Sequence, residues 1–126
     1  MSSMRTPLGR VRGLGSAKSG THHWWMQRVT SLALLPLFLW FILAMLSIAG
    51  ASYAETRAFL AKPWNAVLML ALLGLSFHHI AAGLQVVVED YVRAERPRML
   101  VILAIKGLCW LAALASGFAV LRVAFT

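Results

Sequence analysis

The chain has 126 residues, of which 60% are hydrophobic and only 13% are charged, and its mean hydropathy is +0.76. A water-soluble domain of this length cannot bury so much apolar surface, so the composition excludes a multilayered soluble enzyme and indicates a small helical membrane protein. Twelve Lys and Arg outnumber four acidic residues, but they cluster at the ends of apolar segments. That pattern favours control of membrane topology and argues against nucleic acid as a partner.

The single cysteine, Cys109, excludes an internal disulfide, an iron–sulfur cluster or a structural zinc site made by this chain alone. The sequence also lacks a glycine-rich dinucleotide motif and a phosphate-binding loop. Redox chemistry would therefore need a cofactor inserted between helices, or groups supplied by partner chains.

The N-terminal residues 1–21 are rich in Gly, Ser and Arg and contain no acid, which predicts a flexible basic arm. The same composition also fits a mitochondrial transit peptide. Residues 22–28 form an amphipathic lead-in, in which Trp24 and Trp25 beside Arg28 are suited to the lipid headgroup level.

Three long apolar segments follow, so we predict an all-α membrane protein with three transmembrane helices in a single domain, 1–126. The predicted spans are residues 29–50, 64–88 and 98–125. Pro36 is expected to kink the first span, and Pro63 and Pro97 to open the second and third. The connections, residues 51–62 and 89–98, are polar.

The basic residues predict the orientation of the chain. Eight of them fall on the side that holds the N-terminus and the second connection, and three fall on the opposite side. Basic residues are retained on the cytoplasmic side, so we expect a cytoplasmic (or matrix) N-terminus. A bacterial inner membrane is the predicted location, with the mitochondrial inner membrane as the alternative.

The second span carries the residues best suited to chemistry. His79 and Asp90 are eleven residues apart, which places them within about 20° on one helical face and roughly 16 Å apart along the axis. Gly83 lies one turn from His79 and leaves room for a flat cofactor against the backbone. His79 is thus a candidate axial ligand of haem iron. The alternative is a buried histidine that hydrogen-bonds to a neighbouring helix.

Two further groups lie at the cytoplasmic end. Asp90 and Tyr91 could serve a quinone, because tyrosine can donate a hydrogen bond to a carbonyl oxygen and a carboxylate can relay protons. The alternative is an exposed helix end with an interfacial tyrosine. Arg28, and less directly His22, could pair with haem propionates, or could simply anchor the interface.

If two histidines hold the haem, this chain cannot easily supply both. His78 is rotated by about 100° from His79, and His22 and His23 precede the first span. A partner membrane subunit is therefore expected to provide the second ligand.

The spacing His-x₃-Gly-x₆-Asp-Tyr, formed by His79, Gly83, Asp90 and Tyr91, resembles the second membrane helix of the small cytochrome b anchor subunit of succinate dehydrogenase. The segment Gly20-Thr-His22, with Arg28 and Thr30, resembles the N-terminal part of that subunit. The doubled His78-His79 departs from the pattern, and the spacing to Gly83 and Asp90 favours His79.

The resemblance implies a subunit of a four-subunit respiratory complex, with no catalytic residue of its own for succinate. A flavoprotein subunit and an iron–sulfur subunit would deliver electrons to two membrane anchors, which hold haem b and reduce ubiquinone. His79 would then be the haem ligand, Tyr91 a ubiquinone contact with Asp90 beside it, and Arg28 and His22 propionate contacts. The alternatives are a fumarate reductase-type anchor that uses menaquinone, and a non-redox structural helical subunit.

Overall fold

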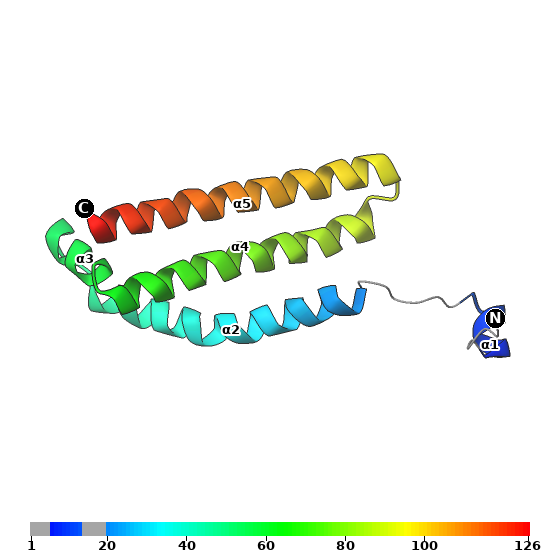
Figure 1. Cartoon of the computed structure of the whole chain (residues 1–126), viewed down its shortest axis with the longest axis horizontal. Coiled ribbons are helices and arrows are strands. Elements are labelled where there is room, and N and C mark those ends of the chain that lie inside the picture. Colours follow the sequence, from blue (N-terminus) through cyan, green and yellow to red (C-terminus); the bar gives the residue numbers. More distant parts are fainter. Residues whose placement is uncertain (1–5, 14–19) are drawn as a thin grey trace.

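The computed structural model describes residues 6–13 and 20–126 and contains only helices there, without a strand. Three of the helices, α2 (Gly20–Ser47), α4 (Pro63–Tyr91) and α5 (Glu95–Phe125), are long and apolar enough to cross a membrane. They run antiparallel to their neighbours along the chain (Figure 1). The prediction of an all-α protein with three membrane-spanning helices is confirmed.

The predicted basic arm, residues 1–21, lies partly outside the described residues, which do not include 1–5 and 14–19. Within the described part, residues 7–11 form a short helix, α1 (Pro7–Val11). The Thr6 side chain accepts a hydrogen bond from the Gly9 amide, and Pro7 occupies the first helical position. Both are ordinary helix-start signals, and the first-turn proline has no amide hydrogen to lose.

Helix α2 joins the amphipathic lead-in to the first span without a break and encloses Pro36. Figure 1 shows it as one continuous, curved ribbon. Proline removes the amide hydrogen that would bond to the carbonyl four residues earlier, and membrane helices tolerate that loss when neighbouring groups compensate. The helix ends at Ser47, and Gly50 follows with φ +80°, a left-handed conformation that favours glycine.

The first connection is more ordered than predicted, because it contains a third helix, α3 (Tyr53–Leu60). Ser52 and Glu55 form a capping box in which the Glu55 carboxylate accepts from the Ser52 amide (2.7 Å) and hydroxyl (2.8 Å). The Asn65 side chain then donates to the Phe59 carbonyl (2.8 Å) and ties α3 to the start of α4. The Ser-x-x-Glu motif is visible in the sequence and would have predicted this helix start.

The capping box makes the stability of α3 depend on pH. Hydrogen bonds from the Ser52 amide, and then from its hydroxyl, lower the pKa of Glu55 below its ordinary value of 4.5. The unfolded segment therefore binds more protons at acidic pH, so the stabilisation is complete above pH 4.5 and is lost as pH falls through the lowered pKa.

We expect Glu55→Gln to remove this pH dependence. The measurement is amide hydrogen exchange of residues 53–60, expressed at each pH as the ratio of the variant to the wild-type chain. The ratio should be largest near neutral pH and approach one in acid. A ratio that does not change with pH would contradict the role of the ionised carboxylate.

Helices α4 and α5 are separated by only three residues, 92–94, so the second connection is shorter than predicted. Helix α5 begins at Glu95, two residues before Pro97, which therefore does not open the helix. The first four amide groups of a helix have no intrahelical partner, so a proline at the third position costs no hydrogen bond.

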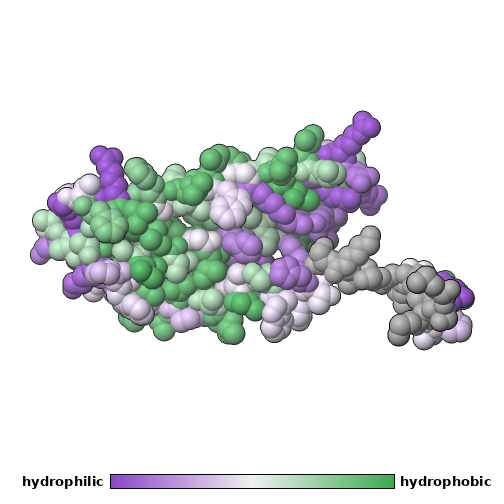
Figure 2. Space-filling model, viewed as in Figure 1, coloured by the Kyte–Doolittle hydropathy of each residue, from purple (hydrophilic) through white to green (hydrophobic). Residues whose placement is uncertain are grey.

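Helix α4 lies between α2 and α5 and packs against both, whereas the backbones of α2 and α5 are not close to each other. Few residues are buried in the described part of the chain, and α5 contributes none of them. Those residues are Thr30, Leu34, Ala44, Ala66, Leu72 and Ala82. Figure 2 shows hydrophobic residues over the middle of the visible face and hydrophilic ones gathered near the α4–α5 connection. An apolar surface of this extent is suited to contact with lipid or with another protein.

Candidate functional site

His79 is half-buried in α4 and directs both ring nitrogens toward α2. Its Nδ1 lies 2.9 Å from Thr30 Oγ1, the usual length of a hydrogen bond between nitrogen and oxygen. Its Nε2 lies 3.5 Å from Gln27 Nε2, at the limit of a hydrogen bond. The bond to a neighbouring helix that the alternative interpretation expected is therefore present. It does not compete with iron ligation, because it uses Nδ1 and leaves Nε2 with only a weak contact.

Gly83 lies one turn from His79, but a side chain from α2 covers its backbone. A Cβ atom at Gly83 would be 3.4 Å from Gln27 Nε2, an ordinary van der Waals contact. The Gln27 side chain thus covers the position at which the sequence predicted a flat cofactor. Its Oε1 is buried and has no hydrogen-bond partner among the described residues. The Gln27 amide is flexible and its oxygen is unpaired, so this side chain can move aside. His79 is then suited to be an axial ligand of haem, and Gly83 leaves space for the edge of the cofactor.

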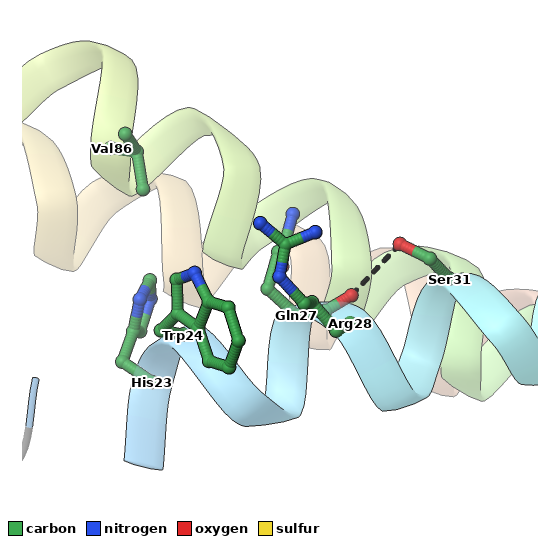
Figure 3. Close-up of a pocket in the computed structure, with 6 residues that line it drawn as sticks. All are labelled: His23, Trp24, Gln27, Arg28, Ser31 and Val86. Atoms are coloured by element: carbon green, nitrogen blue, oxygen red, sulfur yellow. Dashed lines mark hydrogen bonds between the residues drawn. The ribbon is translucent and has the colours of Figure 1, made fainter. Parts of the chain in front are cut away.

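A hollow of about 230 Å³ adjoins Gln27 between the start of α2 and the last turns of α4. Figure 3 shows its lining residues, which are His23, Trp24, Gln27, Arg28, Ser31 and Val86. The Arg28 guanidinium carbon lies 4.4 Å from the centre of the Trp24 ring, a cation–π contact. Enclosed ligand pockets usually measure about 300–1,000 Å³. The hollow is smaller than such a pocket, and Arg28 places a positive charge on its lining.

His22 and His78 do not lie in that hollow. Both line a wider groove of about 700 Å³ between α2, α4 and α5. Gln85, Glu89 and Lys106 also line this groove. The structure thus places His22 and Arg28, which the sequence analysis grouped together, in different hollows. His78 is exposed, whereas His79 is half-buried.

His23 lines both hollows, and its Nε2 is buried without a hydrogen-bond partner among the described residues. The sequence suggested only an interfacial role for it. Its place in the sequence, in the polar lead-in before the first span, carried no signal that Nε2 would be buried.

Asp90 and Tyr91 form the end of α4 and are exposed, Tyr91 to 83%. They belong to the same uninterrupted helix as His79, so the estimated axial separation of about 16 Å holds. Neither residue lines the two hollows. The exposed position leaves both side chains accessible to a substrate or to another subunit.

The sequence matches the succinate dehydrogenase/fumarate reductase transmembrane subunit family over residues 2–121. The chain belongs to this family. It is 33% identical to the succinate dehydrogenase hydrophobic membrane anchor subunit of Rickettsia bellii, over 81% of this chain and 82% of that protein. It is also 34% identical to the subunit of that name from Rickettsia typhi (84% and 85% covered), and 26% identical to the one from Paracoccus denitrificans (79% and 78%).

Membership of the transmembrane subunit family confirms the resemblance found in the sequence. It makes the chain a multi-pass membrane protein that associates with other subunits of a complex. It also explains the small core, because an α5 without buried residues is suited to burial against lipid and partner subunits.

Proposed function

We propose that this chain is the membrane anchor of a succinate:quinone oxidoreductase, in which it supplies one ligand of haem b and part of the ubiquinone site. The observation that carries the proposal is the hydrogen bonding of His79, whose Nδ1 lies 2.9 Å from the Thr30 hydroxyl while Nε2 has only a contact of 3.5 Å. A metal-binding histidine has this arrangement, with one nitrogen held by the protein and the other available.

For haem b, His79 would be the ligand from this chain, and a second membrane anchor would provide the other. Bound haem would supply a reversible one-electron carrier beside the path from the iron–sulfur subunit to quinone. Arg28 would pair with propionate carboxylates, because a guanidinium forms two parallel hydrogen bonds to a carboxylate. His22, which lines the other groove, is the weaker candidate for this role.

For the quinone, Tyr91 would donate its hydroxyl proton in a hydrogen bond to a carbonyl oxygen, and Asp90 would orient the tyrosine or pass protons from water. Reduction of a quinone to a quinol takes up two protons, so a site at the aqueous end of α4 is suitable. The exposure of both side chains in the isolated chain supports a site that is completed by other subunits.

The basic residues support a cytoplasmic N-terminus in a bacterial inner membrane. Asp90 and Tyr91 would lie on the same, cytoplasmic side, where a flavoprotein and an iron–sulfur subunit can dock. We favour succinate oxidation over fumarate reduction because the relatives from Rickettsia and Paracoccus denitrificans carry the succinate dehydrogenase name.

Purification of the native complex through a tag on this chain tests the proposal. We expect a flavoprotein, an iron–sulfur protein and a second membrane subunit to copurify, with succinate-dependent ubiquinone reduction and a dithionite-reduced b-type spectrum. A complete complex without haem absorption would overturn the ligand assignment. A complex that reduces menaquinone but not ubiquinone would favour the fumarate reductase type, and one without a flavoprotein would favour the non-redox structural subunit.

A further inference from the structure

Thr30 is the most buried polar residue in the described part of the chain, with 2% of its surface exposed, and it contacts His79 from the facing helix. Its Oγ1 has three hydrogen-bonding neighbours. They are the Met26 carbonyl at 2.8 Å, the Gln27 carbonyl at 3.1 Å and His79 Nδ1 at 2.9 Å. The contact joins α2 to α4 at the level of the proposed ligand.

The number of protons decides the direction of this contact. A threonine hydroxyl has one proton to donate and two lone pairs that accept, whereas a carbonyl oxygen can only accept. The hydroxyl proton is directed at the Met26 and Gln27 carbonyls, so Oγ1 is left as an acceptor toward His79. Nδ1 must then carry the imidazole proton and donate it to Oγ1.

The Gln27 side chain agrees with this assignment. Its amide nitrogen is a donor and faces His79 Nε2 at 3.5 Å. A proton on Nε2 would put two donors against each other, whereas a lone pair on Nε2 can accept from the amide. The Gln27 contact is thus compatible with the tautomer that the Thr30 hydroxyl indicates.

We infer that Thr30 is a positioning residue that holds His79 with its proton on Nδ1 and so presents the Nε2 lone pair as the metal-binding atom. The inference rests on the proposed function, in which His79 is the haem ligand. The bond Thr30 makes back to its own helix matters for this role. It restricts the hydroxyl to one rotamer and aims the remaining lone pairs at α4.

The first experiment measures the tautomer without haem. The full-length chain, with ¹⁵N-labelled histidine, is placed in lipid bilayers, and solid-state NMR separates protonated from unprotonated ring nitrogens. The four histidines are assigned by single substitution. We expect a protonated Nδ1 and an unprotonated Nε2 at His79, retained in Thr30→Ser and lost in Thr30→Val. A protonated Nε2 in the wild-type chain would overturn the inference.

The second experiment measures haem in the assembled complex. We expect Thr30→Val to weaken haem retention roughly tenfold to a hundredfold, as is typical when the partner of a metal-bound histidine is removed, and to shift the haem midpoint potential. Thr30→Ser should restore both. Ser47→Ala is the matched control, since it removes a similar hydroxyl–carbonyl bond (2.7 Å) within α2, far from His79.

The outcomes separate this inference from the proposed function. A wild-type complex that holds no haem overturns the haem assignment, whatever the NMR result. A wild-type complex with haem, whose Thr30→Val variant keeps the same tautomer, potential and haem content, overturns the role of Thr30 alone. Equal losses in Thr30→Val and Thr30→Ser would show that this position acts through packing and not through its hydroxyl.

Discussion

Replacing His79 by alanine is expected to abolish or alter the dithionite-reduced b-type spectrum of the complex. Alanine offers no donor atom to iron, and no other histidine of α4 can take over, because His78 is exposed and faces the wider groove. The measurement is the reduced-minus-oxidised absorption of solubilised membranes at equal amounts of assembled complex. Gln27, which contacts Nε2, would then lose that contact but keep its place on α2.

His78→Ala is the control for this prediction. It removes an adjacent imidazole of the same helix, and we expect it to leave the haem spectrum unchanged. The opposite pattern, with the spectrum lost in His78→Ala and kept in His79→Ala, would show that the ligand has been placed one residue too far along the chain. Copurification of the other subunits in both variants excludes failed assembly as the cause.

Replacing Tyr91 by phenylalanine is expected to lower succinate:quinone reductase activity roughly tenfold to a hundredfold. The phenol is the proposed donor to the quinone oxygen, where negative charge develops on reduction, and loss of such a donor typically costs about this much or more. Tyr91 is 83% exposed at the end of α4, so the substitution removes no internal packing. The activity with an artificial electron acceptor, which bypasses the membrane site, should be retained.

Two control variants sharpen the quinone test. Tyr53→Phe changes the other tyrosine of the chain, at the start of α3, and should leave quinone reduction unchanged. Glu89→Gln changes a neighbouring carboxylate, which accepts from Gln85 at 2.7 Å, and should also leave quinone reduction unchanged. Equal loss of the quinone and artificial-acceptor activities in Tyr91→Phe would indicate failed assembly and contradict a specific role of the hydroxyl.

The fold was predictable from the sequence where local patterns decide it. Long apolar stretches give three helices in lipid regardless of what packs against them, because an unsatisfied backbone is too costly there. The details that were missed are also local. Ser52 and Glu55 start α3, and Pro97 occupies a position in α5 where its missing amide hydrogen costs nothing. Both signals were present in the sequence.

The candidate site was predictable from the sequence only in part. The spacing from His79 to Tyr91 follows from helical geometry, and the structure keeps both in one helix, as expected. The cover over Gly83 was not predictable, because it comes from Gln27 on another helix. The separation of His22 from Arg28 into two hollows also depends on how α2 faces α4 and α5.

By itself, the sequence determined that this protein is a three-span membrane subunit and that α4 carries a histidine, a glycine and an Asp-Tyr end in a defined order. These properties depend on residues close together in the chain. Only the tertiary structure decided which nitrogen of His79 is held and which is available. Thr30 and His79 are 49 residues apart, and their hydroxyl–imidazole bond exists only because α2 packs against α4 in one register.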